Sequence, residues 1–104
     1  MKYLLGYITT KDKKEAEKIS WSLLKSKLIE CVNIVDKVKS IYWWQGKIED
    51  SEECLMLVKT KKSLAKKIID KVKSLHSYRC PCIIFIPIET GNRDYLKWID
   101  QSTR

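Results

Sequence analysis

The chain has 104 residues and a mass of 12.3 kDa, which suits one domain and is too short for two. Hydrophobic residues make up 44% of it, with only three Gly and two Pro, so the composition argues against a disordered or collagen-like chain. The formal net charge of +8 attracts polyanions non-specifically and identifies no particular partner. We therefore expect one domain that covers residues 1–104.

The first apolar stretch, Lys2–Ile8, is interrupted by Gly6 and followed by Thr9. It is too short for a signal-peptide core and far below the roughly 20 residues of a membrane span. Four cysteines in a chain that carries no export segment are expected to be reduced thiols. We predict a cytoplasmic protein without a membrane partner.

The same stretch is rich in Leu, Tyr and Ile and predicts a buried central strand over Lys2–Ile8. Asp12 and Glu15 have the spacing of a capping box, which predicts the start of a helix. Apolar residues at helical spacing extend this helix to about Leu28.

The segment Cys31–Trp44 has a composition rich in β-branched and aromatic residues and predicts a second, unusually long strand. Asp36-Lys37 interrupts its alternation, which indicates a bulge or bend. Gln45-Gly46 supplies a turn, and Ile48–Val58 is the expected partner strand of a long hairpin.

Ser63 is the expected cap of a second amphipathic helix, which continues to about Leu75. A fourth strand is predicted over Ile83–Ile88. Asn92 is the expected cap of a short last helix.

The resulting order predicts an α+β fold: a ferredoxin-like βαββαβ sandwich with a long hairpin between the second and third strands and an additional C-terminal helix. We expect the helices to cover only one face of the sheet, so the other face is either wet or in contact with a partner. Alternate residues of the hairpin would present either Tyr42 and Trp44 or Ile41 and Trp43 on that open face, so oligomerisation is the expected outcome.

Several uses of this fold are disfavoured by the residues present. A Cu(I) chaperone needs a Cys-x-x-Cys pair in the loop Thr9–Asp12, which holds no thiol. RNA binding is a minor alternative, because the third strand carries Glu52-Glu53 and no Arg/Lys-Gly-aromatic signature. His76 is the one histidine and has no nucleophile-elbow or phosphate-loop spacing beside it, so we expect a protein that is not an enzyme.

Several blocks in a fixed order distinguish the chain more sharply than any single motif. They are Cys31-Val32-Asn33-Ile34, Ser40-Ile41-Tyr42-Trp43-Trp44 with Gly46-Lys47, Lys59-Thr60, His76-x-Tyr78-x-x-Pro81, Pro87-Ile88, Gly91-Asn92 and Tyr95-Leu96-x-Trp98-Ile99. In these blocks the chain closely resembles the CutA family of divalent-cation tolerance proteins. The resemblance implies a ferredoxin-like subunit, a tight homotrimer, and a role in tolerance to copper or other divalent metals.

CutA trimers are also similar in architecture to PII signalling proteins. That similarity implies an alternative, in which a small ligand or an unidentified protein partner binds the clefts between subunits of a signalling or scaffold module without a physiological metal.

The chain departs from the family pattern around the implied site. Ser77 and Arg79 replace a usual Pro and a usual acidic or amide residue, and Cys82 replaces a usual Glu. Glu30 replaces the common small residue before Cys31. A thiol at position 82 favours softer ions such as Cu(I), Zn(II) or Hg(II), whereas Arg79 weakens a nearby cation site.

The candidate metal ligands are Cys31, His76 and Cys82. The residues assigned to a ligand cleft or to the trimer interface are Tyr42, Trp43, Trp44, Glu53, Lys59 and Tyr78. Simpler interpretations stand beside these: Cys31 as a small hydrophobe, His76 as a helix cap, and Trp43 and Trp44 as interface residues. Cys80 and Cys82 form a second potential chelating pair, and Cys54 is expected in the core.

The topology adds a constraint on any shared site. The second strand is predicted to be parallel to the first, so the fourth strand starts at the opposite end of the sheet from Cys31. His76, which precedes the fourth strand, is therefore expected to lie far from Cys31 in one subunit. The hypothesis is a non-enzymatic homotrimer that binds copper, another divalent or soft ion, or a small ligand between subunits, with no obligatory cofactor and no specific nucleic acid.

Overall fold

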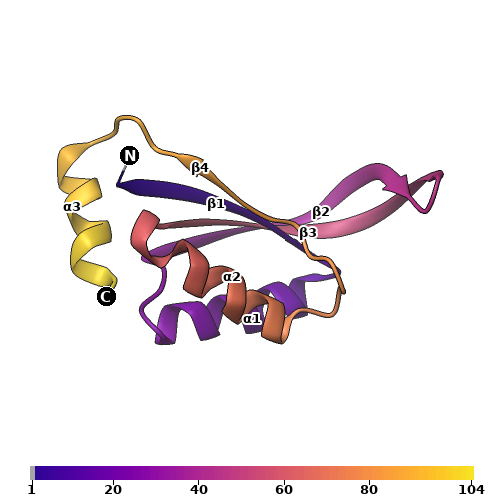
Figure 1. The fold of residues 1–104 in the computed structure, drawn as a ribbon, viewed down its shortest axis with the longest axis horizontal. Coiled ribbons are helices and arrows are strands. Elements are labelled where there is room, and N and C mark those ends of the chain that lie inside the picture. The colour runs from indigo at the N-terminus through magenta and orange to yellow at the C-terminus, as the bar shows by residue number, and fades with distance from the viewer. Residues whose placement is uncertain (1) are drawn as a thin grey trace.

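The computed structural model describes residues 2–104, and these form a four-stranded antiparallel sheet with two helices packed on one face and a third helix at one end (Figure 1). The strand order is β2-β3-β1-β4, and every neighbouring pair is antiparallel. This is the predicted ferredoxin-like arrangement with its long hairpin and additional C-terminal helix.

Strand β1 (Tyr3–Thr10) is central, as expected, and leads into helix α1 (Lys13–Lys25). The predicted cap is present, because the Asp12 carboxylate accepts a hydrogen bond from the Glu15 amide at 2.8 Å, whereas the Glu15 carboxylate accepts from the Lys11 amide and not from that of Asp12. The helix ends three residues before the predicted Leu28. Lys27 adopts a φ of 56°, and the amides of Lys27 and Leu28 bond back to the last turn as in a Schellman motif.

Strands β2 (Cys31–Trp44) and β3 (Lys47–Lys61) form the hairpin. The predicted bulge lies between Val35 and Val38, where the register shifts and Lys37 adopts a φ of 58°. Gln45 and Gly46 both have positive φ, the geometry of a type I′ turn, so the tight turn is also confirmed. The third strand is longer than predicted at both ends.

Helix α2 (Ala65–Leu75) is followed by the edge strand β4 (Ile83–Pro87) and helix α3 (Arg93–Ser102). The prediction that Ser63 caps α2 is wrong, because Ser63 lies within a short 3₁₀ turn, Lys62–Leu64, that leads directly into the helix. The predicted cap of α3 is confirmed, since the Asn92 side chain accepts a hydrogen bond from the Asp94 amide at 3.1 Å.

The core lies between the sheet and helices α1 and α2, which Figure 1 shows side by side on one face. Cys54 is fully buried there, as predicted. We call the opposite surface of the sheet the open face. The expectation that helices cover only one face is wrong at one end, where α3 packs against the open-face residues Leu5 and Lys59. None of the helices within residues 2–104 is long and apolar enough to cross a membrane.

The molecule measures 44 × 26 × 22 Å because the hairpin extends well beyond β1 (Figure 1). Strand β1 ends at Thr10, which pairs with Cys54. Residues 38–53 therefore form a two-stranded projection, here called the arm, without support from β1. An isolated two-stranded ribbon is marginally stable in water, so the arm needs a further contact.

Candidate functional site

The predicted site residues fall into two groups at different places along the sheet. His76, Tyr78 and Cys82 lie by the end of β1, where the Thr9 backbone bonds to both His76 and Cys82. Cys31 lies at the opposite end of the sheet, where it is the first residue of β2 and pairs with Lys59.

His76 anchors the loop between α2 and β4. Its Nε2 lies 2.7 Å from the carbonyl oxygen of Thr9, and its Nδ1 accepts a hydrogen bond from the Tyr78 amide at 3.0 Å. These two bonds correspond to a neutral imidazole with its proton on Nε2. The side chain is 0% exposed. Metal ligation by His76 therefore requires that one of these bonds be broken, and it stays a prediction.

Glu15, predicted from the sequence only as a helix-capping residue, also belongs to this region. One carboxylate oxygen accepts from the Lys11 amide at 3.2 Å, and the other accepts from the Ser77 amide at 2.8 Å. Burial alone would raise the pKa of Glu15, but the hydrogen bonds from Ser77 and Lys11 hold it below its usual value. Glu15 thus ties the start of α1 to the loop after α2.

Tyr78 and Glu53, both assigned to the ligand cleft or trimer interface from the sequence, contact each other in the structure. The Tyr78 hydroxyl donates to the Glu53 carboxylate at 2.9 Å, which fixes the loop on β3. Burial, followed by the bond to Glu53, raises the pKa of Tyr78 well above its usual value. Burial also raises the pKa of the Cys82 thiol, and the Glu53 carboxylate adds to this effect. Glu53 and Cys82 therefore lie in the same region of the sheet, and carboxylate and thiolate are two of the donors that Zn(II) accepts.

Cys31 and Lys59 form the second group. The Lys59 ammonium lies 3.6 Å from the Cys31 sulfur, donates to the Asn33 side chain at 3.1 Å, and lies 5.4 Å from the centre of the Tyr95 ring. Burial alone would lower the pKa of Lys59, but its interactions with Tyr95 and Cys31 raise it above the usual value. Lys59 is therefore a fixed positive charge beside Cys31, which opposes a cation and favours an anion.

A cavity of about 370 Å³ adjoins Lys59 between α3 and the open face. It is lined mainly by apolar side chains, with three polar residues at Lys59, Asn92 and Tyr95. Its size falls in the range of small-ligand pockets.

The aromatic residues of the arm are exposed. Trp43 is 72% exposed and Trp44 53%, and Tyr42 bonds only through its hydroxyl, 3.3 Å from that of Ser51. Exposed indole rings of this size are unusual on a monomer and typical of an interface.

The register separates the two groups of site residues. Cys31 pairs with Lys59, and Lys59 pairs with Leu5, whereas His76 contacts Thr9. Four residues at ~3.4 Å each, or about 14 Å along the strand, lie between these rows. The predicted separation of Cys31 from His76 within one subunit is confirmed. Residues 2–104 hold no group of three or more Cys, His, Asp or Glu side chains arranged to bind a metal ion.

Cys80 and Cys82 are both exposed free thiols on either side of Pro81. They precede the edge strand β4, a position that suits Pro81 because it has no backbone N–H to donate. Chelation by this pair stays a prediction.

Comparison with known proteins identifies the relatives of this chain. The family described as CutA1 divalent ion tolerance protein matches residues 4–102. The divalent-cation tolerance protein CutA of Archaeoglobus fulgidus is 48% identical over 96 residues, which are 92% of this chain and 93% of that protein. Protein CutA 1, chloroplastic, of Oryza sativa is 40% identical over 97% of this chain, which spans only 57% of that longer relative.

The same family is found among solved structures. The A. fulgidus structure, described as a periplasmic divalent cation tolerance protein CutA, superposes with a TM-score of 0.93 at 46% identity and covers 96% of this chain and 97% of its own. The family is named for tolerance to cations and not for a reaction. The fold, the ordered blocks and these relatives agree, and the chain belongs to the CutA1 divalent ion tolerance family.

Proposed function

We propose that this chain acts without catalysis as a homotrimer in tolerance to divalent cations, and that it binds a divalent or soft metal ion at the clefts between subunits. The observation that carries the proposal is the separation along the sheet of Cys31 from Cys82 and Glu53, which lie four and six residues away from its row, together with an arm on which Trp43 and Trp44 are largely exposed.

Assembly would remove the separation between the two groups of site residues. A cyclic trimer has head-to-tail interfaces, in which one end of a subunit's sheet meets a different part of its neighbour. Such a contact brings Cys31 of one subunit toward Glu53 and Cys82 of the next. Thiolate and carboxylate donors from two chains then provide a site for Zn(II) or a softer ion.

Native mass spectrometry of the reduced protein during Zn(II) titration tests this proposal. We expect a trimer of three 12.3 kDa chains that binds the same number of metal ions at each of its equivalent clefts between subunits. Cys31→Ser and Cys82→Ser should each weaken binding, whereas Cys80→Ser, which changes a neighbouring exposed thiol, should not. A monomer, or binding that only Cys80→Ser weakens, would contradict the shared site.

A metal-free signalling or scaffold module is the second candidate, and the Lys59 ammonium favours it. In that case the cavity beside Lys59 takes a small anionic ligand with an apolar body, because its lining is apolar around one fixed cation. Lys59→Met separates the two functions. It should strengthen Zn(II) binding if Cys31 is a ligand, since a competing charge is removed, and leave metal binding unchanged if the cleft serves a ligand instead.

We also propose a cytoplasmic location, in which the four cysteines stay reduced. Thiol trapping of the protein in intact cells should label all four. Trapping that finds oxidised thiols, together with recovery in an exported fraction, would contradict the proposal.

A further inference from the structure

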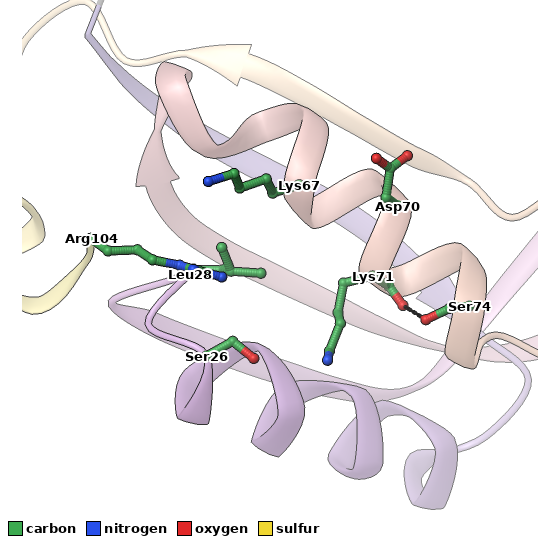
Figure 2. Close-up of a pocket in the computed structure, with 7 residues that line it drawn as sticks. All are labelled: Ser26, Leu28, Lys67, Asp70, Lys71, Ser74 and Arg104. Atoms are coloured by element: carbon green, nitrogen blue, oxygen red, sulfur yellow. Dashed lines mark hydrogen bonds between the residues drawn. The ribbon is translucent and has the colours of Figure 1, made fainter.

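A second hollow lies on the helical layer, away from both groups of site residues. It has a volume of about 340 Å³ and is bordered by the end of α1, by α2 and by the last residue of the chain (Figure 2). The residues around it are Ser26, Leu28, Lys67, Asp70, Lys71, Ser74 and Arg104.

Three cationic side chains border this hollow. Lys67, Lys71 and Ser74 recur at helical spacing, so they share one flank of α2, and Figure 2 shows Lys71 extending toward α1. Arg104 approaches from the opposite side, and Figure 2 shows its side chain crossing beside Leu28. Within residues 2–104, Lys67, Lys71 and Arg104 take part in no ion pair.

The acidic residue at the hollow is already neutralised. Asp70 pairs with Lys66 at 3.3 Å, and Figure 2 shows its carboxylate on the other side of α2 from the Lys71 ammonium. The three cationic side chains therefore outnumber the one acidic side chain of the lining, and the like charges of Lys67 and Lys71, four residues apart on one helix, repel one another.

The frame that carries these cations is fixed. The Arg104 amide donates to the Lys27 carbonyl at 3.1 Å, and the Thr103 hydroxyl donates to Ile99 at 2.7 Å, which holds the end of the chain against α1. Leu28, the floor of the hollow, is buried, and its carbonyl accepts from the Thr60 hydroxyl at 2.6 Å. The backbone that presents Arg104 is therefore pinned beside a rigid apolar floor.

A structural role for one of these charges is expected, because α1 ends beside the hollow and a cation there complements its C-terminal dipole. One charge is enough for that role, and three cationic residues line the same hollow. From this excess of positive charge we propose that the hollow binds a small phosphate-bearing anion through a diphosphate group, whose two or three negative charges complement Lys67, Lys71 and Arg104. The Ser26 hydroxyl borders the same space and adds a potential donor, whereas the Ser74 hydroxyl already donates to the Lys71 carbonyl at 2.6 Å.

Isothermal titration calorimetry with pyrophosphate in about 0.15 M NaCl tests the proposal, because this salt concentration screens the non-specific attraction between pyrophosphate and the exposed lysines. We expect saturable binding by the full chain that weakens about tenfold or more when Lys67, Lys71 and Arg104 are all changed to Gln. The matched control changes Lys14, Lys18 and Lys97 to Gln, which removes the same charge from exposed helix positions outside the hollow. The control should bind within about twofold of the parent.

Two further ligands identify the source of the diphosphate. Equal affinity for pyrophosphate and ADP would mean that the hollow recognises the diphosphate alone, and tighter binding of ADP would mean a nucleoside diphosphate. Binding of adenosine as tight as that of ADP would overturn the proposal. Equal losses in the two triple variants, or no saturable binding of pyrophosphate, would also overturn it and leave only general attraction to a chain of net charge +8.

Amide chemical shifts provide a check that does not depend on affinity. Pyrophosphate should shift the amides of Leu28 and Lys71 in the parent and in the control triple variant, and should leave the amide of Lys59, in the other cavity, unchanged. Shifts confined to Lys59 and its neighbours would overturn the assignment to this hollow.

Discussion

At the scale of single residues, the loop between α2 and β4 depends on a few directed hydrogen bonds. The Glu15 carboxylate accepts hydrogen bonds from the amides of Lys11 and Ser77. His76 bonds through one ring nitrogen to the Thr9 carbonyl and through the other to the Tyr78 amide. All these groups are at least partly buried, so a lost partner leaves an unsatisfied polar group. His76 thus has a structural role in this subunit, and its role as a metal ligand stays a prediction.

Glu15→Gln should lower the free energy of unfolding at neutral pH by about 1.5–3 kcal/mol, because a charged acceptor of two amide hydrogen bonds is lost. The pKa of Glu15 is lowered in the folded state, so its contribution is present above the unfolded value of 4.5 and is lost as the pH falls through the lower folded value. Urea unfolding between neutral and acid pH measures this.

The parent and Glu15→Gln should therefore converge in stability at acid pH. Glu17→Gln, on the exposed side of the same helix, is the matched control and should change stability little at any pH. A deficit in Glu15→Gln that stays constant down to acid pH would contradict the role of its charge.

At the scale of elements, the close packing of β1 between β3 and β4 depends on Gly6. A Cβ at this position would lie 2.5 Å from Val58 and 3.0 Å from Phe85, the residues that pair with Gly6 on the two neighbouring strands. The contact with Val58 is shorter than real Cβ atoms show, and the contact with Phe85 is tighter than most of them. The absence of a side chain at Gly6 therefore allows its two neighbours to meet in the core.

Gly6→Ala should destabilise the fold by about 1–3 kcal/mol, because Val58 and Phe85 must move in a packed interior. Thermal unfolding with circular dichroism measures the change. Gly91→Ala is the control, since a Cβ there would meet Leu96 at 3.6 Å, an ordinary contact. Similar midpoints for the parent and Gly6→Ala would show that the strands adjust without strain.

At the scale of the whole molecule, exposed apolar side chains occupy both the arm and the open face. Those on the arm are Ile41, Tyr42, Trp43, Trp44 and Ile48, and those on the sheet are Val35, Ile84 and Ile86. The set extends over strands from both edges of the sheet, β2 and β4. A surface of this kind favours an assembly in which subunits meet along the arm and the open face.

Trp44→Ala should weaken the proposed trimer while the subunit keeps its secondary structure, because Trp44 lies on the arm and contributes nothing to the core. Sedimentation over a dilution series should show dissociation at a concentration at least about tenfold higher than for the parent. Trp21→Ala is the control, as Trp21 is 63% exposed on α1, away from the arm. Equal dissociation of both variants, or a parent that sediments at 12.3 kDa at micromolar concentration, would refute the role of the arm.

Much of the fold follows from local signals in the sequence. The cap that Asp12 forms on the Glu15 amide, the turn at Gln45-Gly46 and the bulge after Val35 each depend on residues within a few positions of one another. The end of α1 and the start of α2 were less predictable. They depend on Lys27 in a left-handed conformation, which its side chain does not favour, and on a 3₁₀ turn that takes the place of a Ser63 cap.

The sequence by itself determined the order of the elements, the family blocks and the placement of Cys31 and His76 at opposite ends of the sheet. Periodicity, turn chemistry and strand direction, on which these depend, are properties of short segments. Only the tertiary structure decided which residues come together. The Glu15 carboxylate bonds to the Ser77 amide, and Lys71 and Arg104 line one hollow, although the members of each pair are far apart along the chain. Their proximity follows from how α1, α2 and the chain end pack on the sheet, and local pattern carries no information about that packing.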